Sequence, residues 1–145
     1  MALRMLHAEA GLAISPRRIT VSTVGIVPGL ERLAREPLMP NLAISLHATT
    51  EEQRQAIVPP TKKYSLADVL EACRRFPLSR RSRITFEYVL LEGVNDTPED
   101  ARRLASILSG IKGKVNLIPL NAAPGIPFER PSDAPGHRER AHSCR

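Results

Sequence analysis

Segments rich in β-branched and aliphatic residues alternate with segments of helical spacing along this 145-residue chain. Strands are predicted over residues 17–23, 41–46, 83–90 and 114–119, and at least one helical segment separates each strand from the next. A strand that leads through a helix to a second strand forms a right-handed crossover, which gives parallel pairing. The order of the segments therefore predicts an α/β fold with about four parallel strands.

The helical segments carry recognisable start residues. In the helix predicted over residues 65–76, Ser65 and Asp68 have the spacing of a capping box. In the helix predicted over residues 97–110, Thr97 is the N-cap residue. Such caps satisfy backbone N–H groups that the first turn of a helix leaves unpaired. Shorter helices are predicted over residues 2–12, 28–36 and 50–58.

Three of the predicted strands have one aliphatic face and one small or polar face. Successive strand side chains point to opposite sides, so Ser45 and His47 share the polar face of residues 41–47, and Ser22 and Glu87 lie on the polar faces of their strands. A doubly wound sheet would be apolar on both faces, whereas a β/α barrel can hold a ligand inside, near the C-terminal strand ends. The pattern fits a barrel interior. The alternative is a set of hydrogen-bonded core hydroxyls with one core histidine.

Composition limits the setting of the chain. Lys and Arg exceed Asp and Glu by 21 to 15, a net charge of +6, which fits either a nucleic-acid partner or an ordinary basic surface. Two cysteines are too few for a disulfide framework or a metal site, so we expect a reduced, cytoplasmic setting. No apolar run approaches the roughly 20 residues of a membrane span. Cys73 lies within a predicted helix, where we expect it to pack in the core.

Basic side chains cluster before the third predicted strand. Contacts with RNA phosphates and simple solvation near a helix end both explain this cluster, and the pattern alone does not separate them. Its members are Arg74, Arg75, Arg80, Arg81 and Arg83.

Four motifs resemble a known family of enzymes. The segments RRITVSTVGIVPGLERLA, LAISLHATTEEQRQAIVPPTKKYSL, RITFEYVLLEGVND and KVNLIPLNAAPGIPFERPSD occur in this order between about Leu3 and Asp133. They are similar to segments of the RlmN and Cfr family of radical S-adenosylmethionine methyltransferases. RlmN-type members methylate C2 of an adenine in large-subunit ribosomal RNA and in some transfer RNAs. The resemblance implies part of a (β/α)6 partial barrel, with S-adenosylmethionine and a 4Fe-4S cluster as the cofactors of the family.

The resemblance also implies which residues contact the cofactor. The serine of the family's STxGxVP segment matches Ser22, and its SLH triplet matches Ser45, Leu46 and His47. The asparagine of its NLIPxNP segment matches Asn121. A nucleoside with an amino-acid head group needs a few placed donors and acceptors of this kind. No role for Glu87 follows from the sequence.

The family's reactive cysteines have no counterpart in this sequence. The C-x3-C-x2-C triad that holds the cluster is missing, as is the cysteine that carries the methyl group, so we expect no catalytic or metal-ligating residue here. The pattern predicts an incomplete radical S-adenosylmethionine domain over residues 1–128 and a disordered or aberrant tail over residues 129–145. We therefore expect the chain to be a fragment of such a methyltransferase, from a truncated, split or frame-shifted gene, and to be inactive alone.

Two alternative functions stay open at this point. One is a noncatalytic module that binds RNA or cofactor, and the other is an unrelated β/α-barrel enzyme of metabolism. For a partial barrel we also expect association with another chain through the unpaired edges of the sheet. No membrane partner is expected.

Overall fold

The computed structural model describes residues 2–8, 13–58, 63–121 and 124–132. Its strands are β1 (Thr20–Thr23), β2 (Asn41–Ser45), β3 (Ile84–Leu90) and β4 (Gly113–Pro119). Its helices are α1 (Ala2–His7), α2 (Val27–Leu33), α3 (Glu51–Ile57), α4 (Leu66–Arg75) and α5 (Pro98–Ile107), with a short 3-10 turn, η1 (Pro16–Arg18). None of the helices in these ranges is long and apolar enough to cross a membrane.

The four strands form one parallel sheet in the order β1-β2-β3-β4. Ser45 of β2 lies beside Glu87 of β3, and Glu87 lies beside Asn116 of β4. Residues that are paired in this way point to the same face of a sheet. The predicted α/β fold with parallel strands and interleaved helices is confirmed.

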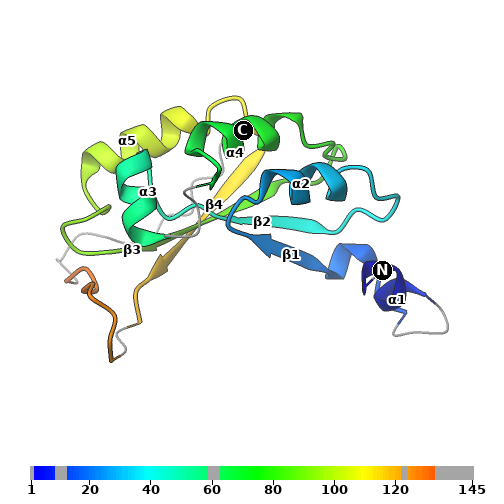
Figure 1. Cartoon of the computed structure of the whole chain (residues 1–145), viewed down its shortest axis with the longest axis horizontal. Coiled ribbons are helices and arrows are strands. Elements are labelled where there is room, and N and C mark those ends of the chain that lie inside the picture. The colour runs from blue at the N-terminus through cyan, green and yellow to red at the C-terminus, as the bar shows by residue number, and fades with distance from the viewer. Residues whose placement is uncertain (1, 9–12, 59–62, 122–123, 133–145) are drawn as a thin grey trace.

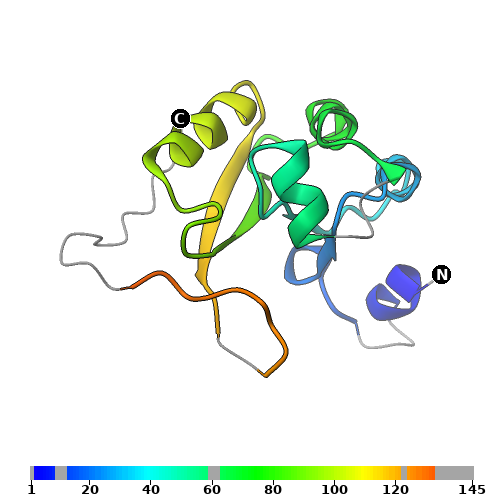
Figure 2. The same ribbon diagram turned by 60° about the vertical axis from the view of Figure 1, so that its left-hand side comes forward.

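Helices α2, α3, α4 and α5 all cover the same face of the sheet (Figure 1). The turned view shows the same layering, with the helices on one side of the strands and residues 124–132 on the other (Figure 2). The apolar core fills the space between helices and sheet, and its strand residues include Leu42, Ile44, Ile84, Phe86 and Tyr88. The other face of β2 and β3 is therefore left to the small and polar residues of the same strands.

The capping signals read from the sequence are confirmed. The Ser65 side chain accepts from the backbone N–H of Asp68, and the Asp68 carboxylate accepts from the Ser65 backbone in return. Thr97 and Asp100 form the same reciprocal pair at the start of α5. These caps explain why α4 and α5 begin within one residue of the predicted positions.

The first strand starts later than predicted. Residues 17–19 were expected in the strand, but Arg17 and Arg18 lie in η1. Pro16 favours a turn at this position because its ring fixes φ, and the N–H of Arg18 donates to the carbonyl of Ser15 at 2.8 Å. The β-branched pattern did not reveal this local preference.

The predicted tail falls largely outside the described residues, as does Cys144. Within the described part, the carbonyl of Glu129 accepts a hydrogen bond of 3.0 Å from the N–H of Glu92. The chain at residue 129 is therefore held against the segment that follows β3. Residues 9–12 of the first predicted helix are also outside the described part.

The strands β1 and β4 form the two edges of the sheet in the described ranges. Leu117 of β4 is 46% exposed, which is unusual for a large aliphatic side chain on a strand. Unpaired strand edges favour pairing with other chains. Association through these edges stays a prediction.

Gly25 offers a test of the packing between β1 and the helix layer. A Cβ built on Gly25 would lie 2.6 Å from Val69 of α4, and its φ of +94° is unfavourable for other residues. We expect Gly25→Ala to lower the free energy of unfolding by about 3 kcal/mol, measured by urea denaturation. Gly93→Ala is the matched control, because its φ is +65° but a Cβ meets nothing within 4 Å. Equal losses in the two variants would contradict close packing at Gly25.

Candidate functional site

Three polar side chains meet on the face of the sheet that helices α2–α5 leave open. Ser22 of β1 and Ser45 of β2 both donate to Oε2 of Glu87, at 3.4 and 3.2 Å. Ser22 is exposed, whereas Ser45 and Glu87 are half-buried. The predicted residues Ser22 and Ser45 are thus brought together. The carboxylate that joins them belongs to Glu87, for which the sequence predicted no role.

His47 follows β2 by two residues and lies beside this group. Its Nδ1 accepts a hydrogen bond of 3.1 Å from the backbone N–H of Val89. Because a backbone N–H can only donate, Nδ1 carries no proton and the neutral ring holds its proton on Nε2. The ring therefore offers one N–H donor to a ligand. Burial lowers the pKa of His47, the Glu87 carboxylate opposes that shift, and the Arg54 guanidinium adds to it.

The backbone of His47 is held in a rare conformation. Its φ is +57°, in the left-handed region that few residues with a side chain adopt. The buried side chain of Asn95 stabilises it by donating to the carbonyls of His47 and Val89, at 2.8 and 2.7 Å. The Oδ1 atom of Asn95 also accepts from the N–H of Leu91 at 2.8 Å. Sequence reasoning missed Asn95, although it belongs to the EGVND motif on which the resemblance partly rests.

Leu46 and Asn121 occupy different surroundings. Leu46 is fully buried in the core with its side chain on the helix side, and its N–H donates to the carbonyl of Glu87. A contact between Leu46 and a ligand would therefore come from its carbonyl oxygen. Asn121 lies two residues beyond β4 and is exposed. All five predicted residues lie in the last part of a strand or just after it.

A buried polar network supports the chain beyond His47. Thr49, Gln53 and Arg103 all donate to Oδ1 of Asp100, which is 3% exposed. Burial raises the pKa of Asp100, but hydrogen bonds from Thr97, Gln53 and Arg103 outweigh it and hold the pKa below its usual range. The network fixes the segment after β2 against α5, which limits the movement of the His47 backbone.

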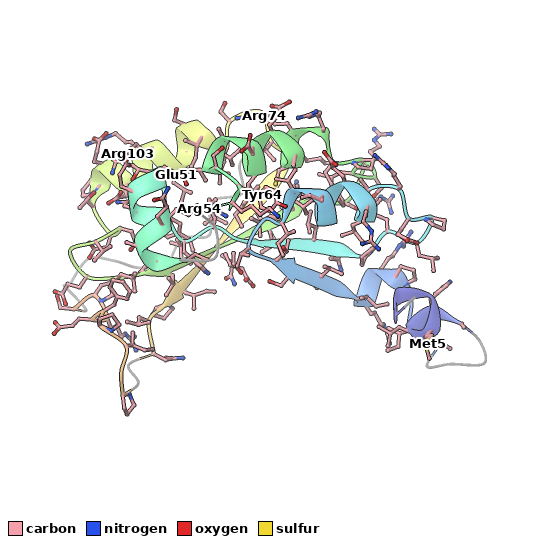
Figure 3. All side chains as sticks on the ribbon, viewed as in Figure 1. Met5, Glu51, Arg54, Tyr64, Arg74 and Arg103 are labelled. Carbon is pink, nitrogen blue, oxygen red and sulfur yellow. The ribbon has the colours of Figure 1, made fainter. Side chains whose placement is uncertain are left out.

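Arg54 is the largest fully buried side chain in the described ranges. It points from α3 toward Tyr64 (Figure 3), and its two terminal nitrogens donate to the carbonyls of Tyr64 and Val24. Burial lowers its pKa, and the Glu51 carboxylate opposes that shift. Val24 directly follows β1, so Arg54 joins the exit of β1 to the start of α4. A single arginine in a helical pattern gives no sign of such a role.

The described residues hold no group of three or more His, Cys, Asp or Glu side chains that could bind a metal ion. Cys73 packs in the core as predicted, and burial raises the pKa of its thiol to about 12. A protonated thiol that is buried in the core is a poor metal ligand. Cys73 therefore does not fit a cluster site.

The arginine cluster and the candidate site lie at opposite ends of the strands. Arg74 and Arg75 pair with Glu71 on α4, while Arg80, Arg81 and Arg83 are exposed before β3. They adjoin the N-terminal end of β3, whereas Ser45 and His47 adjoin the C-terminal ends of parallel strands. Solvation at a helix end and contact with RNA phosphates both stay predictions for the cluster, and we assign it no part in the site.

His47 predicts how stability depends on pH. The pKa of His47 in the folded chain is below its ordinary value of 6.5, so the unfolded chain binds more protons as pH falls. The stability due to neutral His47 is present above that value and is lost as pH falls toward the folded pKa. We expect the urea midpoint to decrease between about pH 7.5 and about pH 5, and His47→Gln to reduce the decrease. An NMR titration midpoint for His47 above 6.5 would contradict this.

Asn95→Ala tests the hydrogen bonds that hold His47. The change leaves two carbonyls and one N–H without partners in a buried setting. We expect a loss of about 3 kcal/mol in the free energy of unfolding, together with altered amide shifts at His47 and Leu91. Asn116→Ala is the control, because Asn116 is exposed on β4 and should change stability by less than about 0.5 kcal/mol. Similar losses in both variants would show that Asn95 is not a specific support.

Comparison with known proteins identifies relatives of the chain. No protein-family model matches it. It is 54% identical over 140 residues to the dual-specificity RNA methyltransferase RlmN of Anaeromyxobacter dehalogenans, covering 97% of this chain and 37% of that protein. It is 56% identical over 131 residues to RlmN of Geobacter sulfurreducens, covering 90% of this chain and 36% of that protein. The chain thus spans just over a third of the length of these relatives.

A solved structure is similar over the same part. The crystal structure of a radical SAM methyltransferase from Sphaerobacter thermophilus superimposes with a TM-score of 0.85 and 49% identity. The match covers 90% of this chain and 38% of that one. Sequence and fold agree, so the predicted resemblance is confirmed: this chain is homologous to part of the RlmN radical S-adenosylmethionine methyltransferases.

Proposed function

We propose that this chain forms part of the S-adenosylmethionine pocket of an RlmN-type methyltransferase. The observation that carries the proposal is the meeting of Ser22 and Ser45 at Glu87 on the open face of the sheet, with His47 just beyond the end of β2. Each is a residue that the family resemblance matches to a cofactor contact. Their position at the carboxyl ends of parallel strands is where barrels of this kind bind ligands.

The donors and acceptors of the site suit an adenosyl ligand. The Nε2–H of His47 donates, the serine oxygens and the Glu87 carboxylate accept, and the Leu46 carbonyl is a further acceptor at the same strand exit. Asn121 adds an amide from the exit of β4. When bound, S-adenosylmethionine supplies the methyl group and, with a reduced cluster, the radical of the family's chemistry. The residues of this chain bind and orient the cofactor.

We propose that this sequence alone does not catalyse methyl transfer. A 4Fe-4S cluster needs three convergent thiolates, and the sequence contains only Cys73 and Cys144. The described Cys73 does not fit such a site. The proposed function of this sequence is therefore to bind the cofactor, and cluster ligands must come from another segment or chain.

We propose that the RNA substrates are those of the RlmN family, an adenine in ribosomal RNA and in transfer RNA. We propose a cytoplasmic setting for this function. RNA would approach the carboxyl ends of the strands, where the candidate site lies, and not the arginine cluster at the other end. An unrelated metabolic barrel is inconsistent with the similarity to RlmN enzymes.

Calorimetric titration with S-adenosylmethionine tests the cofactor site. We expect weak but saturable binding, because the cluster iron that anchors the amino-acid head group in the family is not supplied here. Replacing both Ser45 and His47 with Ala should reduce affinity by at least about tenfold, since two hydrogen-bonding groups are lost. The control removes Ser106 and His7, an exposed serine and histidine on α5 and α1. Binding that survives the Ser45 and His47 replacement would contradict the assigned site.

A further inference from the structure

We infer that Glu87 recognises the ribose hydroxyls of the nucleoside that occupies the candidate site. This inference rests on the proposed function and adds a residue to it. Glu87 stands on β3, between the serine-bearing strands and β4, and none of the described Lys or Arg side chains forms a salt bridge with it. A half-buried carboxylate in this position has capacity for further hydrogen bonds.

The direction of the existing hydrogen bonds decides what the cluster can bind. Ser22 and Ser45 both give their hydroxyl protons to Oε2 of Glu87. Their oxygens keep lone pairs, and Oε1 of Glu87 accepts no hydrogen bond in the described ranges. Ser22, Ser45 and Glu87 therefore present only acceptors to the open face, and the Asn116 amide lies beside them on β4. The cluster calls for a ligand with neighbouring donors, and the two adjacent hydroxyls of a ribose are such a pair.

Donor hydroxyls explain the cluster better than a cationic centre does. Ser22 is exposed, so water screens direct attraction between Glu87 and a sulfonium charge. Hydrogen bonds to a carboxylate are short and roughly twice as strong as hydrogen bonds between neutral groups. A sulfonium also has no N–H or O–H group to place against the serine oxygens. The ribose is accordingly the part of the ligand that Glu87 contacts.

His47 is placed to contact the same nucleoside from the next strand exit. Its Nδ1 accepts a hydrogen bond from the backbone N–H of Val89, which lies on β3 two residues from Glu87. The groups beside Glu87 are thus two hydroxyls, one from β1 and one from β2, the Asn116 side chain of β4 and the His47 ring. A ligand that spans these strands would meet acceptors at Glu87 and a donor at His47.

Binding of three ligands separates the possible roles of Glu87. The probes are S-adenosylmethionine, S-adenosylhomocysteine, which lacks the positive sulfur, and the 2′,3′-dideoxy analogue of S-adenosylhomocysteine. Chemical-shift titration reaches millimolar dissociation constants, so weak binding is measurable. We expect Glu87→Gln to weaken the first two probes by the same factor, about tenfold, and to leave binding of the dideoxy analogue unchanged.

Two further variants control for charge and for folding. Glu87→Asp keeps the charge but draws the carboxylate away from the serines, and it should weaken the first two probes as Glu87→Gln does. Glu92→Gln removes an exposed carboxylate just beyond β3 and should change nothing. The amide spectrum of each variant reports whether the sheet is intact.

The outcomes distinguish this inference from the proposed function. If Glu87→Gln lowers the affinity for S-adenosylmethionine alone, Glu87 interacts with the sulfonium charge and the inference is overturned. The inference is also overturned if Glu87→Gln binds all three probes as tightly as the unaltered chain does. If the Ser45 and His47 replacement abolishes binding in the same experiment, the proposed function still stands. Absence of saturable binding by the unaltered chain overturns both.

Discussion

The alternation of side chains along β2 and β3 is the constraint on which the rest of the molecule depends. Ile44 and Phe86 must lie beneath the helices to form the core, so Ser45 and Glu87 are directed to the opposite face. A shift of one residue in register would bury the polar set and expose the apolar one. The same packing that stabilises the fold therefore positions the candidate site, and neither can change alone.

The sequence predicted those parts of the fold that depend on local signals. The four strands, the parallel order and the caps at Ser65 and Thr97 follow from periodicity and from side chains that bond to nearby backbone. The predicted start of β1 was wrong, because Pro16 and the turn after it override the strand preference of the following residues. Local propensity is a weak guide where a turn competes with a strand.

The site was only partly predictable. Ser22, Ser45 and His47 came from motifs, and their faces came from alternation. Three further roles depend on partners that lie between 10 and 65 positions away in the sequence: those of Glu87, Asn95 and Arg54. For Asn95, a backbone turn also brings several groups to its side-chain amide. Such contacts become visible only when the chain is folded. Residues that bond to backbone carbonyls of other segments leave no periodic pattern.

Asn95 joins the two strand exits at a single side chain. Its amide contacts His47 beyond β2 and both Val89 and Leu91 at the end of β3. Neither exit can separate from the other without leaving buried polar groups unpaired, so the two belong to one cooperative unit of local opening. A ligand that contacts only His47 would then slow amide hydrogen exchange at Leu91, a position that it need not touch.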